Sequence, residues 1–360
     1  MIKDIDNTLI HLVKTYSPTG KEKQAISIFN SYLKKLGATN VITDRAGNGL
    51  GIFAGEGLSI TLCGHIDTVP GKLPVMVKNG VLYGRGSVDA KSSLVSLLYG
   101  AIIAKEAGFK GTLTVIAATG EEGMGKGILE VARTQPKSDY AIFGEPGNVD
   151  GITVGYRGRL LLDVMFETEP FHASAPWIGG GSVDAAMTAW SKIRDHYSGR
   201  TGFYEVSVAM TGIHGGRSDN VIPSKTTITL DIRFPMPVDK NDILKEVLGI
   251  FESLNLPVQV KIRIISEVKP YVSNTKSPLA KAFRFAIGQK TGTNARLVFK
   301  SGSGDMNFLG NSWNIPAITY GPGNTQLSHT NNEFIRLEDV EKSAEIVSEA
   351  LISLERELKY

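Results

Sequence analysis

The sequence has a single cysteine, no long apolar run and little net charge, and each absence excludes a class of protein. Cys63 is the only cysteine among 360 residues, so an internal disulfide is impossible, and we expect a buried structural thiol in a reducing compartment. No apolar stretch approaches the ~20 residues that a membrane span requires, so we expect no membrane association. The first residues, Met1-Ile2-Lys3-Asp4, mix charges where a secretory signal is apolar, which favours a cytoplasmic protein.

The excess of positive over negative charge is also small. The formal net charge of +3 is small for a nucleic-acid-binding protein, and no basic patch is interleaved with aromatic residues, so we expect no nucleic-acid partner. Residues 158–268 hold 11 Lys and Arg against 13 Asp and Glu, a net charge of −2, which leaves +5 on the remainder. A basic remainder is compatible with an acidic substrate or partner.

Hydrophobic patterning predicts a first domain of alternating strands and helices. Residues 58–63, 112–118 and 140–143 are short apolar runs bounded by Gly or polar residues, and helical spacing covers residues 92–107 and 126–133 between them. This order predicts an α/β fold with a mostly parallel sheet and helices on both faces.

The pattern changes near Gly158. From there to residue 268 the order strand, helix, strand, strand, helix, strand predicts a ferredoxin-like α+β unit. The α/β pattern resumes after Pro270. We therefore predict a discontinuous main domain, residues 1–157 and 269–360, with a second domain inserted at residues 158–268.

Acidic and histidine residues follow the predicted strands at the point where each strand ends. His65 and Asp67 follow the first strand, Glu121 and Glu122 follow the second, and Glu145 follows the third. Ligands of open α/β sheets bind outside the carboxyl ends of the strands. We therefore expect these side chains to converge on one crevice.

Two further residues fit the same cluster. Asp89 stands just before a predicted helix, and His329 follows a Gly-rich loop. Each residue alone has an ordinary explanation, such as a helix N-cap or a structural histidine. Together, their mutual repulsion and desolvation favour a bound polycation. Imidazole and carboxylate ligands without thiolate suit catalytic zinc, cobalt or manganese, and two such ions about 3.5 Å apart would make a bridging water acidic enough to attack a carbonyl.

The segments that carry these residues resemble the zinc metallopeptidase and deacylase family that includes acetylornithine deacetylase, succinyl-diaminopimelate desuccinylase, carboxypeptidase G2 and the aminoacylases. The resemblance spans nearly the whole chain, and Ser92, where many members have Gly, is a small departure. The matching motifs are Ser17-Pro-Thr-Gly20, His65-Ile-Asp-Thr-Val-Pro70, Leu82-Tyr-Gly-Arg-Gly-Ser-Val-Asp-Ala-Lys91, Glu121-Glu122, Gly144-Glu-Pro146 and His329.

The resemblance implies two zinc ions, with cobalt as an alternative, bridged by Asp89. His65 and Glu145 would complete one metal site, and Glu122 with His329 the other. The family also has a cis peptide bond after the bridging aspartate, which here would join Asp89 to Ala90. Residues 1–157 and 269–360 would then be the catalytic domain, and the insertion a lid and dimerisation domain.

Three further roles follow from the resemblance. Asp67 would hydrogen-bond His65 and select its tautomer. Glu121 would be the general base, taking a proton from the attacking water and delivering it to the leaving amine. His172 of the lid matches a histidine that in dimeric relatives reaches the partner's active site and stabilises the oxyanion, which implies a homodimer.

Residues for substrate binding are implied at three positions. Asn220 and Arg233 match positions where relatives bind a substrate carboxylate or carbonyl, and a guanidinium can bind a carboxylate through two parallel bonds. A surface turn and a strand-end salt bridge are the alternative explanations. Gly302 lies in a Gly-rich loop that lines the substrate pocket in relatives.

The substrate is suggested by Glu145 and by the segment around it. Deacylases of the family tend to carry Glu at that position, and aminopeptidases Asp. Residues 144–158 and the compact length most resemble short enzymes of archaeal and Thermus-type lysine biosynthesis, which release lysine, and in some organisms ornithine, from the C-terminal glutamate of a small acidic amino-group carrier protein. The resemblance thus implies hydrolysis of this isopeptide bond in lysine or arginine biosynthesis.

Other substrates and functions stay open at this point. A deacylase of N-acetylornithine, N-acetyl-lysine or succinyl-diaminopimelate differs from the carrier-protein hydrolase in few residues. An aminopeptidase is a third possibility. A non-catalytic metal-binding protein on the same fold would be expected to lose its base, whereas Glu121 is intact.

Overall fold

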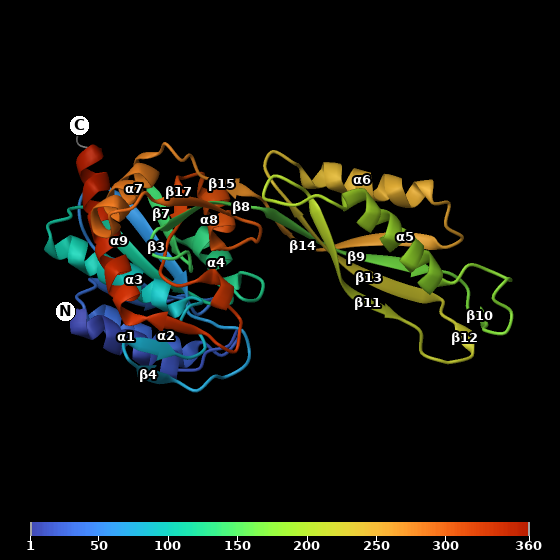
Figure 1. Ribbon diagram of the computed structural model, residues 1–360, viewed down its shortest axis with the longest axis horizontal. Coiled ribbons are helices and arrows are strands. Elements are labelled where there is room, and N and C mark those ends of the chain that lie inside the picture. Colours follow the sequence, from blue (N-terminus) through green and yellow to red (C-terminus); the bar gives the residue numbers. More distant parts are fainter. Residues whose placement is uncertain (1, 359–360) are drawn as a thin grey trace. The chain divides into compact units, whose positions relative to one another are not determined.

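The computed structural model describes residues 2–358, which divide into two compact units (Figure 1). The first unit takes the chain up to Gly155, Val272–Phe299, and the chain from Gly304 on. The second unit takes Tyr156–Tyr271 and also Lys300–Ser303. The expected insertion covered residues 158–268 and did not include the short segment 300–303.

A mostly parallel sheet forms the centre of the first unit. Among the described residues it has nine strands in the order β1-β2-β6-β3-β7-β17-β8-β15, with β16 paired to β8. The central strands β6, β3, β7 and β17 are parallel, whereas β2 and β8 run antiparallel to their inner neighbours. The strands are β1 (Asn40–Thr43), β2 (Gly49–Phe53), β3 (Ser59–His65), β6 (Thr112–Ala118), β7 (Tyr140–Gly144), β8 (Gly151–Tyr156), β15 (Tyr271–Val272), β16 (Arg296–Lys300) and β17 (Ala317–Thr319).

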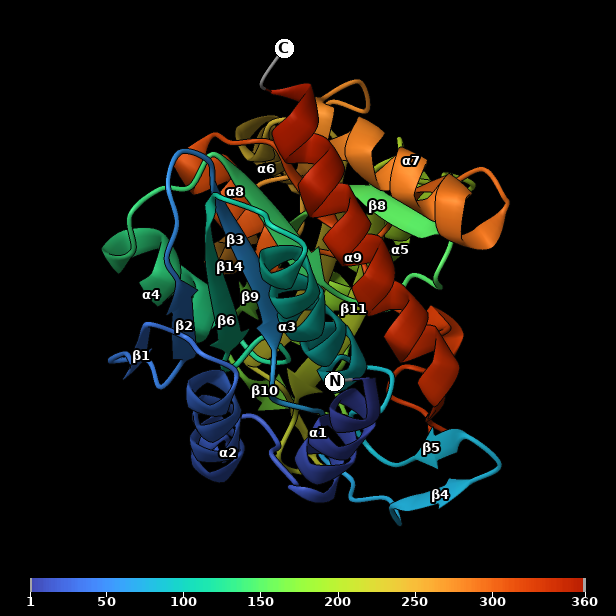
Figure 2. The ribbon, with the colours of Figure 1, turned by 90° about the vertical axis from the view of Figure 1, so that its left-hand side faces the viewer.

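Helices cover this sheet, as Figure 2 shows for α3 and α9. Helix α3 contacts β3, β6 and β7, and α1 and α9 pack against α3. Alternate residues Leu113, Val115 and Ala117 of β6 join the same apolar cluster as these helices. Within the described chain, no helix is both long and apolar enough to cross a membrane. The helices are α1 (Ile2–Lys14), α2 (Lys23–Lys35), α3 (Lys91–Glu106), α4 (Lys126–Thr134), α7 (Pro278–Thr291), α8 (Asp305–Trp313) and α9 (Leu337–Glu357).

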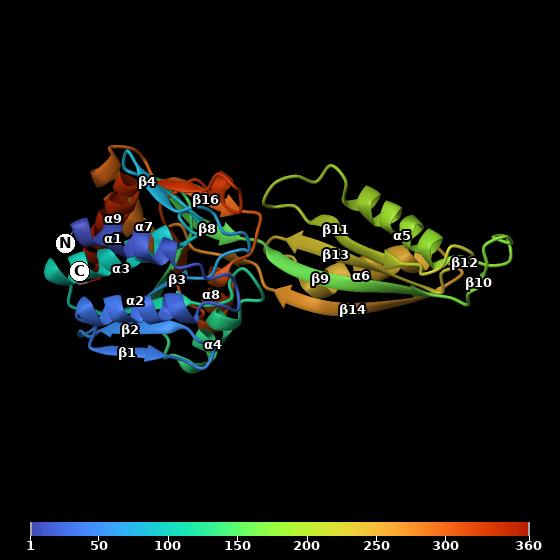
Figure 3. The same cartoon turned by 90° about the horizontal axis from the view of Figure 1, so that it is seen from below.

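The second unit is a four-stranded antiparallel sheet with two helices. Its strands β9 (Gly158–Glu167), β11 (Ser207–Gly215), β13 (Lys225–Phe234) and β14 (Gln259–Val268) take the order β11-β13-β9-β14 (Figure 3). The helices are α5 (Ser182–Tyr197) and α6 (Lys240–Ser253). Buried residues alternate along β9, because one face of the sheet packs under these helices. This is the order and pairing of a ferredoxin-like unit.

Two small sheets complete the fold. The three-stranded sheet β18-β5-β4 joins Phe334–Arg336 to Val81–Tyr83 and Met76–Lys78 in the first unit. In the second unit, β10 (Phe171–His172) pairs with β12 (Val221–Ile222).

Candidate metal centre

Three neighbouring parallel strands end at the candidate site. His65 is the last residue of β3, which lies between β6 and β7 and is hydrogen-bonded to both. Glu121 and Glu122 follow β6 in sequence, and Glu145 directly follows β7. The carboxyl ends of these strands therefore bring the four side chains to one edge of the sheet, as the sequence pattern indicated.

Glycines at the strand ends let helix α3 approach closely and so bring Asp89 to the same edge. A Cβ atom on Gly64 would lie 3.1 Å from Leu94 Cβ, and one on Gly144 would lie 3.0 Å from Leu97 Cδ1. Such spacing leaves almost no room for a side chain. Asp89 stands two residues before α3, and the Asp89–Ala90 peptide bond is cis, as the family resemblance implied.

The two carboxylate oxygens of Asp89 face different histidines. Oδ1 lies 3.2 Å from His65 Nε2, and Oδ2 lies 3.3 Å from His329 Nε2. Glu145 Oε1 is 3.4 Å from His65 Nε2, and Glu122 Oε1 is 2.9 Å from His329 Nε2. The structure thus groups the residues as two half-sites that share one carboxylate.

Potential ligand atoms are close enough to share an ion. Those of His65, Glu121 and Glu145 lie within 4.8 Å of one another, as do those of His65, Asp89 and Glu122. His65 therefore stands at the centre of the cluster. His329 completes it from the outside, with half of its side chain exposed.

Asp67 takes part in a different way from that expected. His65 Nδ1 donates to the backbone carbonyl of Asp67 at 2.9 Å, while the nearer oxygen of the Asp67 carboxylate is 3.6 Å away. The carboxylate instead accepts bonds from Thr19 Oγ1 at 2.7 Å and from the backbone N–H groups of Glu121 and Glu122 at 3.1 and 3.2 Å. The carbonyl therefore leaves Nε2 of His65 available as a ligand, and the carboxylate holds the turn that carries both glutamates.

The pKa values reflect the burial of these groups and the contacts between carboxylates and imidazoles. Loss of solvation, followed by the charge of Glu145, raises the pKa of Glu121 well above its usual range. Burial opposes ionisation of Asp89, but hydrogen bonds from His329 and His65 hold its pKa far below the usual value. The hydrogen bond to Asp89 in turn raises the pKa of His329 to about 9. Positive charge is therefore favoured between the carboxylates.

The donor set fits two divalent cations. Four carboxylates and two imidazoles meet in the space described, so the negative charges outnumber what two protonated imidazoles can neutralise. Cys63 offers no thiolate there, because burial raises the pKa of its thiol and keeps it protonated. Nitrogen and oxygen donors without thiolate match zinc, cobalt or manganese in catalytic sites. His65, Asp89, Glu122, Glu145 and His329 are the residues that would hold the ions.

Several polar residues of this site were missed from the sequence. Burial and the charge of Glu145 raise the pKa of Asp305, the first residue of α8, to about 7. Arg85 and Glu333 form a buried ion pair beside Asp89. Arg85 stands inside a motif that was recognised, but nothing in the sequence links it to Glu333, because their contact spans 248 positions.

The second unit places His172 beside Asn220. Both are exposed, and the pairing of β10 with β12 joins their segments, since Ala173 N–H donates to the Asn220 carbonyl at 2.9 Å. The backbone N–H of Ser174 donates to His172 Nδ1 at 3.1 Å. Because an N–H group can only donate, the proton of neutral His172 lies on Nε2, which makes Nε2 a hydrogen-bond donor.

Arg233 lies in β13 of the four-stranded sheet, at the end away from the β10–β12 pair. Its guanidinium bonds the Asp231 carboxylate at 2.6 and 3.1 Å and Ser303 Oγ at 3.2 Å, which puts it beside the loop of Gly302. Arg233 pairs with Arg159 at the start of β9, whereas the segment of His172 follows the end of β9 at Glu167. Eight residues of strand separate these ends by about 27 Å. His172 and Arg233 of one unit therefore lie too far apart to contact one small substrate together.

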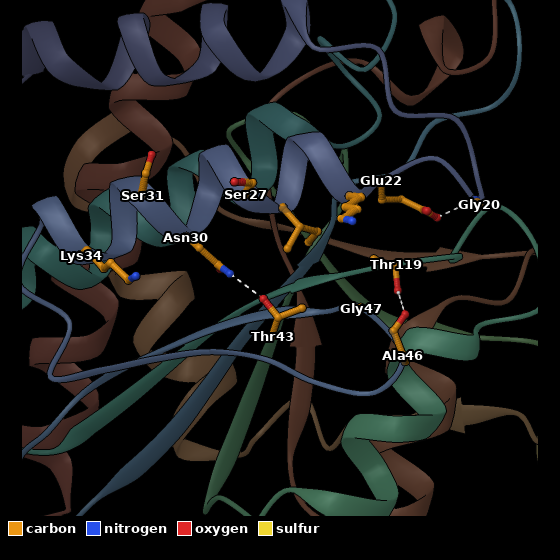
Figure 4. Close-up of a pocket in the computed structure, with 12 residues that line it drawn as sticks. Gly20, Glu22, Ser27, Asn30, Ser31, Lys34, Thr43, Ala46, Gly47 and Thr119 are labelled. Atoms are coloured by element: carbon orange, nitrogen blue, oxygen red, sulfur yellow. Dashed lines mark hydrogen bonds between the residues drawn. The ribbon is translucent and has the colours of Figure 1, made fainter.

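A separate groove in the first unit lacks this chemistry. It has a volume of about 730 Å³ and lies between α2 and the segment 43–47, lined by polar side chains such as Lys23, Asn30 and Thr43 (Figure 4). Asn30 donates to Thr43 there at 2.9 Å. None of the candidate metal ligands lines this groove.

Comparison with known proteins places the chain in a family. The model of "Peptidase family M20/M25/M40" matches residues 61–353. The chain is 32% identical over 338 residues to the LysW-lysine/LysW-ornithine hydrolase of Sulfurisphaera tokodaii, covering 94% of this chain and 92% of the relative. It is 33% identical over 333 residues to the LysW-lysine/LysW-ornithine hydrolase of Saccharolobus solfataricus, covering 92% and 90%.

Solved structures share the fold. A tripeptidase from Staphylococcus aureus superposes with a TM-score of 0.84 at 21% identity, covering 99% of both chains. A Bacillus subtilis protein described as a dinuclear metal binding peptidase of the M20 family superposes with a TM-score of 0.75 at 14% identity, covering 98% of both chains. The match of the family model to most of the chain, with curated relatives that span nearly its full length, leads to one conclusion: the chain belongs to peptidase family M20/M25/M40 and is a hydrolase of that family.

Proposed function

We propose that the chain is a cytoplasmic amide hydrolase with two zinc ions that releases lysine, ornithine or both from the C-terminal glutamate of an amino-group carrier protein, in lysine or arginine biosynthesis. The observation that carries the proposal is the shared carboxylate of Asp89, whose oxygens lie 3.2 and 3.3 Å from His65 and His329. The names of the curated relatives support the substrate.

The candidate metal ligands and the candidate base have different roles in the reaction. Two divalent cations held by His65, Asp89, Glu122, Glu145 and His329 would supply Lewis-acid catalysis for attack on the amide carbonyl. Glu121 stands beside this cluster, and the Asp67 carboxylate holds its backbone N–H. Glu121 takes the proton of the attacking water and passes it to the leaving amine, which departs as the free α-amino group of lysine or ornithine.

The second unit supplies groups for the substrate's charges. Nε2 of His172 carries the proton and would donate to the oxyanion that develops on the carbonyl, and the Asn220 backbone lies beside the segment of His172. Arg233 carries a guanidinium suited to a substrate carboxylate, next to the loop of Gly302. Because the ends of this sheet are about 27 Å apart, a homodimer, in which His172 serves the partner's site, explains how both ends act.

The test compares three substrates on the zinc- or cobalt-loaded protein: the lysine-loaded carrier protein, N-acetylornithine and succinyl-diaminopimelate. A preference for the carrier of about tenfold or more in kcat/KM, about 1.4 kcal/mol of transition-state binding, supports the proposal. A preference for either small substrate would retain the metal chemistry and refute the carrier assignment.

A further inference from the structure

A buried ion pair lies behind the candidate metal centre. Arg85 Nη1 is 2.9 Å from Glu333 Oε2, and 6% of the Arg85 side chain and none of the Glu333 side chain is exposed. A buried ion pair usually contributes little net stability, because desolvation of both charges offsets their attraction. The main effect of the pair is therefore on the segments that it holds in place.

The Glu333 carboxylate holds the loop of the shared metal ligand. Its Oε1 atom accepts hydrogen bonds from the backbone N–H groups of Gly86 at 2.9 Å, Val88 at 2.9 Å and Asp89 at 3.1 Å. Three N–H groups that converge on one oxygen define the course of this loop. Asp89, whose side chain faces both histidines, is the last residue of the set.

The Arg85 guanidinium holds the loop of His329. Nη1 also donates to the carbonyl of Thr330, the next residue after His329, at 2.9 Å. Nε donates to the carbonyl of Gly71 at 3.1 Å. The Gly84 N–H donates to the carbonyl of Glu333 at 3.2 Å, so backbone and side chains connect the same two segments.

His65 and Glu145 are held in another way. His65 belongs to β3 and Glu145 directly follows β7, so the hydrogen bonds of two central strands place them. His329 and Asp89 lie outside the central strands, in segments that the ion pair joins. The half-site of Asp89, Glu122 and His329 therefore depends on the pair more than the half-site of His65, Asp89 and Glu145.

We infer that Arg85 and Glu333 are positioning residues for one of the two metal ions, the ion bound by Asp89, Glu122 and His329. The inference rests on the proposed dinuclear site. It assigns the pair no contact with substrate and no proton transfer. Its consequence is unequal metal binding when the pair is broken: the ion of Asp89, Glu122 and His329 loses more affinity than the ion of His65, Asp89 and Glu145.

The test is a metal titration of the whole protein, by calorimetry and by the visible absorption of Co²⁺. The wild type should bind two ions. Glu333→Gln keeps the shape of the side chain but points an amide NH₂ at Arg85. We therefore expect the ion of Asp89, Glu122 and His329 to lose at least about tenfold more affinity than the other ion, which corresponds to about 1.4 kcal/mol. Arg85→Gln should give the same pattern. Glu333→Asp, which keeps the charge, should recover part of the lost affinity.

Glu355→Gln is the matched control. The Glu355 carboxylate also accepts two backbone N–H bonds, from Lys110 at 2.8 Å and Gly111 at 3.1 Å, but it braces a loop outside the candidate site. This variant should bind both ions as the wild type does. Far-UV circular dichroism verifies folding, and Arg85→Lys provides a milder variant if Glu333→Gln does not fold.

The outcomes separate two failures. If folded Glu333→Gln and Arg85→Gln bind both ions with wild-type affinity, or lose the same affinity for both, the inference is overturned and the dinuclear site stands. A wild type that binds fewer than two ions would refute the dinuclear site and the inference with it.

Discussion

At the residue scale, Glu121 combines the features of a general base. Its carboxylate lies within 4.8 Å of ligand atoms of His65 and Glu145, and its pKa is raised by loss of solvation and by Glu145. Asp67 fixes its backbone. A carboxylate held beside the proposed metal ligands is placed to take a proton from the attacking water.

Glu121→Gln should therefore remove activity without removing metal. We expect kcat to fall by about 10²–10⁴-fold, since an amide cannot accept the proton. Metal content measured by atomic emission should match the wild type. Activity within tenfold of the wild type would exclude Glu121 as the base.

Metal binding should release protons, because His329 is protonated in the metal-free protein below its raised pKa of about 9. A cation needs the neutral imidazole, so metal affinity should rise with pH and level off above about 9. Titration calorimetry in buffers with different ionisation enthalpies measures the number of protons released. His329→Ala should release fewer protons. An affinity independent of pH between about pH 6 and 8 would contradict this.

The residues of the site also show how much of it could be predicted from the sequence alone. His65, Glu122, Glu145, Asp89 and His329 could be grouped because strand ends and motifs identify them. The contact between Asp67 and His65 could not be predicted, because the backbone carbonyl of Asp67 rather than its carboxylate bonds His65. Backbone groups are the same in every sequence. The partner of Arg85 is equally hidden, since only the folded chain brings Glu333 to it.

At the scale of elements, the position of α3 determines where Asp89 lies. The helix packs on β3 at Gly64, where an added Cβ would lie 3.1 Å from Leu94 Cβ and 3.2 Å from Leu94 Cα. These atoms belong to or adjoin the helix backbone, so the conflict cannot be relieved by a side-chain rotation. Leu94 and the helix backbone that carries it would have to shift by a few tenths of an ångström.

Gly64→Ala should consequently weaken both stability and metal binding. Overpacking of this kind typically costs about 1–3 kcal/mol, and a shifted helix moves Asp89 away from the histidines. Urea unfolding followed by circular dichroism and a metal titration measure the two effects. Gly249→Ala is the control: its Cβ would have no atom within 4 Å, and alanine in the interior of α6 should stabilise by about 0.5–1 kcal/mol. Unchanged values for Gly64→Ala would contradict the packing argument.

Elements with strong periodicity could be predicted, and short or irregular ones could not. The strand 112–118 has the predicted bounds, and the helix predicted at 126–133 ends one residue later, at Thr134. Strand β8 (Gly151–Tyr156) was missed, because all six of its residues are buried and no alternation marks it. The β10–β12 pair was missed because its two-residue strands are too short to show a period.

At the scale of the whole molecule, the proposed homodimer rests on the arrangement of the second unit. Arg233 lies beside the start of β9, and the segment of His172 follows the other end of β9, about 27 Å along the strand. An isologous dimer would let each copy supply both ends, one to its own site and one to the partner's.

Mixing two inactive variants tests this arrangement. His172→Ala and Glu121→Gln should each be nearly inactive alone. If His172 acts across the dimer, random exchange of equal amounts leaves one complete site in four, so about a quarter of wild-type activity should return. Subunit exchange is verified with differently tagged chains. Verified exchange without recovered activity would place His172 in its own subunit's site or outside the reaction.

The chain leaves the large sheet and returns to it at neighbouring points. Strands β8 and β15 are adjacent, and Ser273 N–H donates to the Val154 carbonyl at 2.7 Å. A hairpin turn across one inter-strand gap of about 4.8 Å could close this opening without rethreading the backbone. In evolutionary terms, the stretch between these points is an insertion. A single genetic event could add, remove or exchange it without changing the order of the strands on either side.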